Sequence, residues 1–107
     1  TMSLYTLDEL KGRVVEAADA YNENAEEPNR IRKISLFGSY AKGIASQNSD
    51  IDLLVSFTSS VVSLFTLAKV LSSMEEHLET PVDVVQEPVP DDSLLMIEAV
   101  IPLYERS

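Results

Sequence analysis

Residues 36–55 have the sequence LFGSYAKGIASQNSDIDLLV, in which two apolar segments enclose a polar loop. The first apolar segment begins at Ile31 and ends at the pair Gly38-Ser39, and the second follows Asp50 and carries Asp52 inside it. Short apolar runs bounded by glycine and small polar residues are typical of buried strands. We therefore predict strands over residues 31–37 and 50–57, joined by a helical turn at 40–42 that ends at Gly43.

Three aspartates interrupt apolar strand segments. Asp50 and Asp52 flank Ile51, and Asp83 lies within a further predicted strand at 82–85. Burial of an ionised carboxylate is costly unless a cation or hydrogen bonds compensate. Residues two apart in a strand share a face, so Asp50 and Asp52 point the same way, and Asp83 joins them if its strand is adjacent. Converging carboxylates suit a hard divalent cation such as Mg²⁺, so all three are candidate metal ligands and catalytic residues.

The pair Gly38-Ser39 is a candidate phosphate-binding turn. It follows a strand and opens a helical turn, where backbone N–H groups without an intrahelical partner favour anions. Gly38 lets a phosphate approach the backbone closely, Ser39 adds a hydroxyl donor, and Lys42 supplies a positive charge one turn further on. A phosphate site beside a carboxylate site is what a nucleoside triphosphate carrying Mg²⁺ requires.

The two motifs together resemble the signature of the nucleotidyltransferase superfamily related to DNA polymerase beta. The run from Leu36 to Gly43, followed by Asp-Ile-Asp at 50–52 in an apolar strand, is similar to the minimal nucleotidyltransferase (MNT) group in particular. The resemblance implies transfer of AMP from ATP with two Mg²⁺ ions. For the antitoxin branch of that group it implies a tyrosine of a cognate HEPN ribonuclease toxin as the acceptor. The family counterpart of Lys42 is more often arginine, so here only a point charge is expected.

Hydrophobic periodicity predicts the remaining elements. Helices are expected over residues 7–25 with Thr6 as the N-cap, over about 60–78 and over 94–100, where Pro102 would end the last one, and a short edge strand is expected at 103–104. This order predicts a single α/β domain over residues 1–107. The resemblance implies the nucleotidyltransferase fold, a small central mixed sheet flanked by helices.

Composition narrows the classes of function. The chain has 107 residues, no cysteine and a net charge of −10. Disulfides and zinc–thiolate sites are excluded, and a reducing cytoplasm is compatible. The negative charge disfavours direct nucleic-acid binding, and the apolar stretch at 61–74 is too short and too polar to span a bilayer. Without an acceptor lobe, the domain is expected to assemble as a hetero-oligomer or homodimer.

Each candidate residue also has a structural interpretation. Asp50 could be a loop carboxylate before a strand, and Asp83 an edge-strand charge that discourages aggregation. Gly38 and Ser39 could form a plain strand-to-helix turn, and Lys42 could be a solvated helix residue.

The sequence leaves two main functions open. One is the adenylyltransferase described above. The alternative is a non-catalytic binding module that neutralises a basic partner by covering it, with the apolar residues of 94–103 as its surface. A third interpretation, transfer to a small molecule, is disfavoured because the relatives of that kind carry a second domain for the acceptor.

Overall fold

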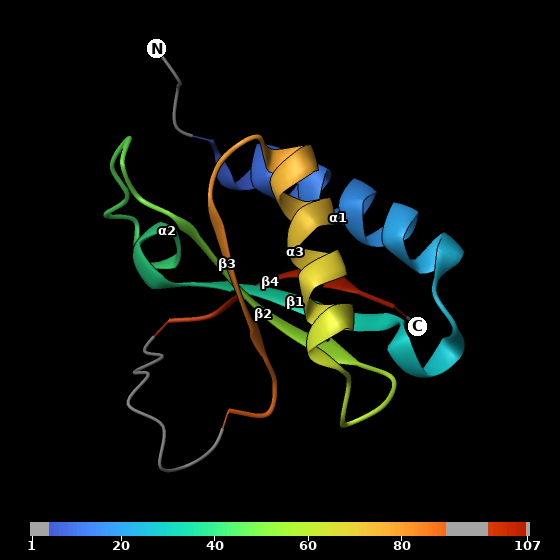
Figure 1. Ribbon diagram of the computed structural model, residues 1–107. Coiled ribbons are helices and arrows are strands. Elements are labelled where there is room, and N and C mark those ends of the chain that lie inside the picture. The colour runs from blue at the N-terminus through green and yellow to red at the C-terminus, as the bar shows by residue number, and fades with distance from the viewer. Residues whose placement is uncertain (1–4, 90–98, 107) are drawn as a thin grey trace.

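The computed structural model of the chain describes residues 5–89 and 99–106. These residues form three α-helices, one 3₁₀ turn and four strands, and Figure 1 shows how the labelled helices and strands are arranged. In chain order the elements are α1 (Leu7–Asn24), the 3₁₀ turn η1 (Glu27–Asn29), β1 (Ile31–Phe37), α2 (Gly38–Lys42), β2 (Ile51–Phe57), α3 (Leu64–Leu78), β3 (Val82–Gln86) and β4 (Ile101–Glu105).

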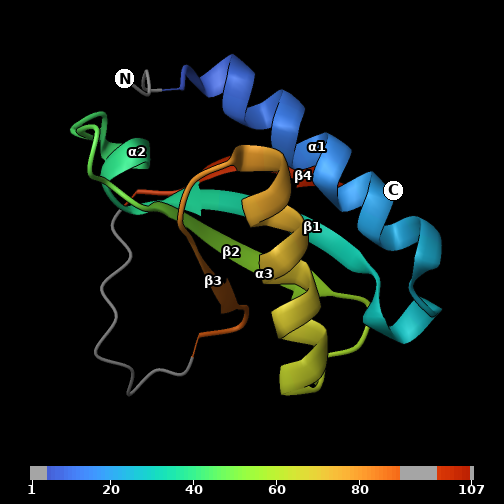
Figure 2. The same ribbon diagram turned by 45° about the horizontal axis from the view of Figure 1, so that its top comes forward.

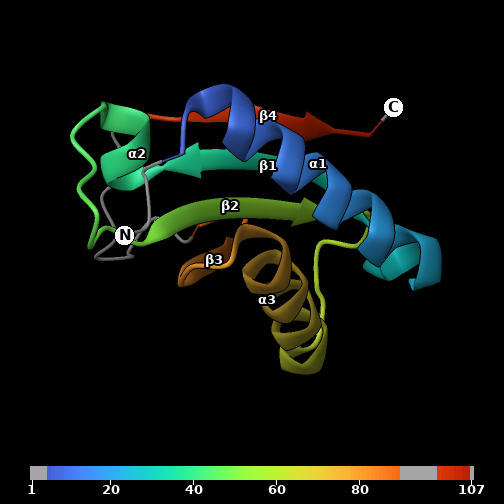
Figure 3. The same ribbon diagram turned by 90° about the horizontal axis from the view of Figure 1, so that it is seen from above.

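The four strands form one mixed sheet in the order β3-β2-β1-β4. β1 is antiparallel to both β2 and β4, whereas β2 and β3 are parallel and are joined through α3. Figures 2 and 3 show α1 and α3 together on one face of this sheet. The predicted mixed sheet flanked by helices is therefore confirmed.

Local sequence explains where α1 begins. The Thr6 hydroxyl accepts a hydrogen bond from the Glu9 N–H at 3.1 Å, and the Glu9 carboxylate accepts one from the Thr6 N–H at 2.9 Å. This reciprocal pair satisfies two backbone donors that the first turn of a helix leaves without partners. Thr6 is thus the N-cap, as predicted. No helix in the described residues combines the length and apolar character that crossing a membrane requires.

The core lies between the sheet and the two long helices. Its members are apolar residues from one face of each strand and from the inward stripes of the helices. Those with no exposed surface include Leu10, Val14, Ile34, Leu36, Ile51, Leu53, Val55, Val70 and Met74.

The helix predicted from about residue 60 begins four residues later, at Leu64. Residues 60–63 lie outside the helix, and here the Ser59 hydroxyl donates to the Val61 carbonyl at 2.9 Å and accepts from the Val61 N–H at 3.2 Å. Ser63 is the N-cap and accepts from the Thr66 N–H at 3.1 Å. Local side-chain bonds of this kind compete with helix formation.

The C-terminal segment also differs from the structure predicted for it. Pro102 was expected to end a helix, but it lies within β4, which begins at Ile101 rather than at residue 103. β4 is an edge strand, where the missing N–H of a proline is tolerated. Residues 94–98 of the predicted last helix lie outside the described residues, and Ala99 and Val100 are not helical.

Candidate active site

The register of the sheet brings the predicted motifs to one end of the molecule. The Cα atom of Phe37, the last residue of β1, pairs with that of Asp52 in the neighbouring β2. Gly38 follows Phe37 directly and begins α2. Because β2 and β3 are parallel and start at the same end, Asp52 also pairs with Asp83. Gly38, Asp52 and Asp83 therefore come from three different elements and meet at one place.

Asp52 points away from the two long helices. Its neighbours Ile51 and Leu53 belong to the core beneath α1 and α3, and alternation along the strand turns Asp52 to the opposite face. Phe37 and Leu54 on this second face are buried but lie outside that core cluster. The carboxylate consequently has an apolar surface on two sides while remaining partly open to solvent.

Gly38 is in direct contact with Asp52. Its φ angle of +72° lies in the left-handed region, which residues with a side chain rarely adopt. A Cβ atom added at Gly38 would overlap Oδ2 of Asp52 and lie 3.0 Å from its Cγ. Glycine is required here for both its backbone angle and its lack of a side chain.

The Asp52 carboxyl has a strongly perturbed pKa. Burial against the apolar surface raises this pKa, and so do the negative charge of Asp83, a hydrogen bond with the Asp83 carboxyl and the charge of Asp50. Together they raise the pKa of Asp52 from 3.8 to about 6. A group of carboxylates that repel one another around a partly buried member is a common feature of functional sites.

The premise that all three aspartates are buried within strands is wrong for two of them. Asp50 precedes β2 and is exposed, and Asp83 is exposed on the edge strand β3. Only Asp52 is partly buried. Asp83 can therefore be an edge-strand charge that discourages aggregation and also a neighbour of Asp52. Both roles are compatible with the pairing of β3 with β2.

Ser39 and Lys42 lie on α2, the five-residue helix that starts at Gly38. Ser39 is partly exposed and Lys42, at the other end of the helix, is exposed. Gly43 ends the helix in the left-handed conformation with φ of +75°, as predicted. The backbone N–H groups at the start of α2 thus lie next to the Asp52 carboxylate, an arrangement that suits a phosphate bridged to the carboxylates by a cation.

The donor set fits a hard divalent cation. The groups at the site are carboxylate oxygens, and the raised pKa of Asp52 reflects a charge repulsion that a cation would relieve. Among the described residues, however, no cluster of three or more histidine, cysteine, aspartate or glutamate side chains is arranged to hold a metal by itself. Further oxygen ligands would have to come from a substrate phosphate or from water, as is usual for Mg²⁺.

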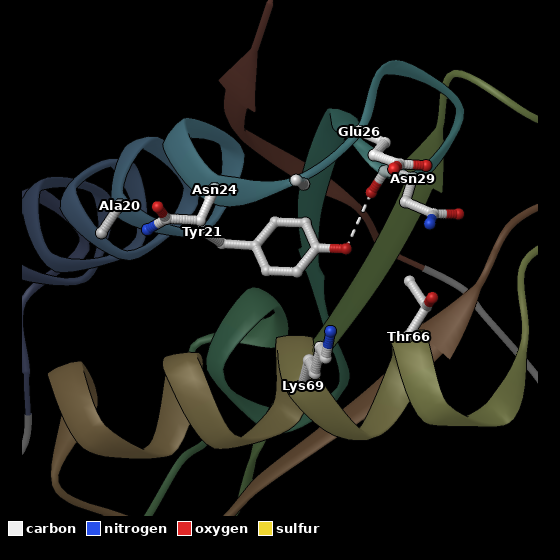
Figure 4. Close-up of a pocket in the computed structure, with 8 residues that line it drawn as sticks. Ala20, Tyr21, Asn24, Glu26, Asn29, Thr66 and Lys69 are labelled. Atoms are coloured by element: carbon white, nitrogen blue, oxygen red, sulfur yellow. Dashed lines mark hydrogen bonds between the residues drawn. The ribbon is translucent and has the colours of Figure 1, made fainter.

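Two cavities were not predicted from the sequence. One, of about 360 Å³, adjoins α2 and is lined by Tyr5, Leu7, Tyr40, Ala41, Lys42, Gly43 and Ala45. The other, of about 440 Å³, lies between the end of α1 and the beginning of α3. Figure 4 shows it around Tyr21, whose hydroxyl donates to the Asn29 carbonyl at 2.8 Å. None of the three aspartates lines either of these two cavities.

Sequence reasoning did not single out Phe37 as more than a strand residue. It lies directly across the sheet from Asp52, and its burial contributes to the apolar surroundings of that carboxylate. The position of Phe37 opposite Asp52 is known from the register of β1 and β2, and no signal in the sequence specified that register.

Known proteins are similar to this chain in sequence and in structure. The chain is 31% identical over 86 residues to "Protein adenylyltransferase MntA" of Thermococcus cleftensis, and the match covers 80% of this chain and 82% of that protein. The fold resembles a chain in the crystal structure of a toxin–antitoxin with AMP-PNP, with a TM-score of 0.68, 20% identity and coverage of 90% of this chain and 73% of that one.

A second fold match is a chain in the complex of the tri-AMPylated Shewanella oneidensis HEPN toxin with its MNT antitoxin, with a TM-score of 0.64, 16% identity and coverage of 94% and 74%. The polymerase beta nucleotidyltransferase family model matches residues 21–106, which include β1, the Gly38-Ser39 turn and all three aspartates. This chain belongs to the polymerase beta nucleotidyltransferase family.

Proposed function

We propose that the chain is a protein adenylyltransferase that transfers AMP from ATP to a tyrosine hydroxyl of a HEPN-type toxin, and so acts as its antitoxin. Family membership and the similarity to a protein adenylyltransferase support the reaction class. The fold shared with MNT antitoxins supports the choice of partner. The observation that carries the proposal is the contact of Gly38 with Asp52, which sets a phosphate-binding turn against a perturbed carboxylate.

The backbone at the start of α2 binds the triphosphate. N–H groups of Gly38 and Ser39 face oxygens of the phosphates, and the Ser39 hydroxyl adds a donor. Lys42, at the other end of the same short helix, contributes positive charge to the phosphate tail. These contacts hold the α-phosphorus beside the carboxylates and orient pyrophosphate as the leaving group.

Asp50 and Asp52 would hold Mg²⁺ together with oxygens of the substrate phosphates, and Asp83 would complete the carboxylate set. When bound, Mg²⁺ would neutralise negative charge on the phosphates and lower the pKa of the acceptor hydroxyl. Asp52 is the fixed member of the set because β2, Phe37 and Gly38 restrict it. Asp50 and Asp83 are exposed and can adjust to the substrate.

Asp83 takes the proton of the acceptor hydroxyl. It is exposed, so an incoming side chain can reach it, and it lies next to Asp52 across the sheet. The acceptor oxygen forms a bond to the α-phosphorus, the bond between the α-phosphorus and the bridging oxygen breaks, and pyrophosphate leaves with that electron pair. The product is a tyrosine carrying AMP as a phosphodiester.

Incubation of the chain with the toxin, labelled ATP and Mg²⁺ tests the proposal. The wild-type chain is expected to label the toxin, and the double variant Asp50→Asn, Asp52→Asn is expected to leave it unlabelled while its thermal unfolding remains cooperative. A matched control, Glu16→Gln with Glu23→Gln, removes two exposed charges from α1 and should transfer AMP normally. Transfer by the aspartate double variant would refute the assignment of the site.

A second candidate function, neutralisation by complex formation alone, is favoured by one observation. Val61, Leu64 and Phe65 are 78%, 84% and 69% exposed, and such a group of apolar side chains is typical of an interface. If complex formation alone neutralises the toxin, the aspartate double variant protects cells from the toxin as well as the wild type does, and protection needs no ATP. If transfer is required, the same variant binds the toxin but does not protect.

A further inference from the structure

A third pocket lies at the opposite end of the sheet from Asp52. It has a volume of about 390 Å³ and is formed where β1 begins, where β2 ends and where the chain leaves β3. Its lining residues are Arg32, Lys33, Ser56, Phe57, Thr58, Ser59, Ser60, Glu87 and Pro88. Ser56 is four residues beyond Asp52 on β2, which places the pocket roughly 13 Å from the carboxylates.

Two cations of this pocket have no partner among the described residues. Acidic residues outnumber basic ones by 18 to 8 in the chain, so a basic side chain is expected to find a carboxylate. Within residues 5–89 and 99–106, Arg32 and Lys33 nevertheless have no side-chain hydrogen bond, ion pair or ring contact. Among the remaining basic residues in this part of the chain, Arg13 pairs with Glu79, Arg30 and Arg106 pair with Glu27, Lys69 lies over the Phe65 ring and Lys42 also has an interaction.

The other polar groups of the pocket determine how much negative charge a ligand should carry to match it. Ser56, Thr58, Ser59 and Ser60 supply hydroxyl groups around the two cations, and Glu87 adds one negative charge. The net charge of the lining is therefore +1, from two cations and one carboxylate. This matches a single carboxylate better than a phosphate dianion or a polynucleotide backbone.

The shape and surroundings of the pocket fit a protein. Eight of its nine lining residues retain access to solvent, and only Phe57 is buried, whereas a small molecule is usually enclosed. The loop that lines the pocket continues into exposed Val61, which is tied to Ser59 by two hydrogen bonds. Leu64 and Phe65 follow within one turn of α3. An apolar area with arginine at its rim is the usual composition of a protein interface.

We propose that this pocket docks a carboxylate side chain of the acceptor protein, with Val61, Leu64 and Phe65 receiving an adjacent apolar side chain of the same protein. That the partner is the acceptor protein rests on the proposed function. That the surface binds a carboxylate beside an apolar side chain does not rest on it. The surface is separate from the catalytic carboxylates. It therefore contributes to the affinity for the acceptor protein and leaves the binding of ATP and the transfer step unchanged.

Charge reversal tests the proposal. Arg32→Glu and Lys33→Glu each change the charge by two units, and Lys11→Glu, at an exposed position of α1, makes the same change outside the pocket. Binding of the purified acceptor protein is measured without ATP at low and at high salt. Each pocket variant is expected to weaken binding about five- to tenfold at low salt, and Lys11→Glu less than about twofold. The KM for the acceptor should rise by the same factor, while kcat and the KM for ATP stay unchanged.

The outcomes separate the two proposals. If the wild type transfers AMP but Lys11→Glu weakens binding as much as Arg32→Glu does, only the overall charge matters and the docking pocket is refuted. If a labelled RNA oligonucleotide binds the wild type and loses affinity in Arg32→Glu, the pocket serves a nucleic acid and the proposal is also refuted. Absence of AMP transfer by the wild type refutes the proposed function, and the binding measurement without ATP still decides on the pocket.

Discussion

Asp52→Asn is expected to stabilise the cation-free protein at neutral pH. The substitution keeps the shape of the side chain and removes its charge, and the new amide can donate a hydrogen bond to Asp83. The pKa of Asp52 is raised from 3.8 to about 6, so between these values the folded protein holds a proton that the unfolded chain has lost. By linkage, the ionised carboxyl destabilises the fold, and this effect grows as the pH rises from about 4 through 6.

The magnitude follows from the size of the shift. About two pKa units correspond to an upper limit of about 3 kcal/mol in the free energy of unfolding. Asp52 is only partly buried, so solvent screening reduces this value to about 1 kcal/mol. For a domain of this size, a gain of about 1 kcal/mol raises Tm by roughly 4–8 °C.

Thermal unfolding in EDTA between pH 4 and pH 8 measures this effect. Asp52→Asn should unfold at a higher temperature than the wild type at pH 8 and at nearly the same temperature at pH 4. Glu16→Gln, which removes one exposed charge from α1, is the control for net charge. A variant that is less stable than the wild type at pH 8, or a difference in Tm that does not depend on pH, would contradict the origin assigned to the perturbed pKa.

Two further substitutions test one residue of the site, Gly38, and one buried polar residue of the fold, Asn22. Gly38→Ala should abolish AMP transfer and lower the free energy of unfolding by at least about 1–2 kcal/mol, because alanine disfavours a φ of +72° and its Cβ would overlap the Asp52 carboxylate. Urea unfolding and the labelling assay measure the two effects, and normal transfer would show that the contact is dispensable. Asn22→Ala should cost about 2–4 kcal/mol, because the buried Asn22 amide bonds both the N–H and the carbonyl of Ile31, at 2.8 and 3.1 Å, and the Tyr104 hydroxyl at 3.1 Å. A loss below about 1 kcal/mol in urea unfolding would show that water replaces these bonds.

The site also shows how far residue pattern predicts position. Alternation in a strand was sufficient to place Ile51 and Leu53 in the core and Asp52 on the other face, because the side-chain period of a strand is fixed by its backbone. The same pattern could not show that Asp50 lies before the strand and is exposed. Exposure depends on what the rest of the chain places over a residue, and that is a property of the assembled sheet.

Errors in element boundaries had local physical causes. The apolar period alone predicts that α3 starts near residue 60, whereas the Ser59 side chain bonds the backbone of Val61 and Ser63 acts as the N-cap, so the helix starts at Leu64. The sequence pattern predicts that a helix ends at Pro102, because proline cannot continue a helix. The position of β4 at the edge of the sheet makes the same residue compatible with a strand.

The sequence by itself determined the order and type of nearly all described elements, the capping of α1, the left-handed turn at Gly43 and the chemistry of the candidate site. These features depend on interactions between residues a few positions apart, which a linear pattern contains. Only the tertiary structure decided that Phe37 and Asp83 lie on either side of Asp52, and that Arg32 and Lys33 share a pocket with Glu87. Such neighbours are set by strand pairing between distant segments, and its register results from packing the whole core.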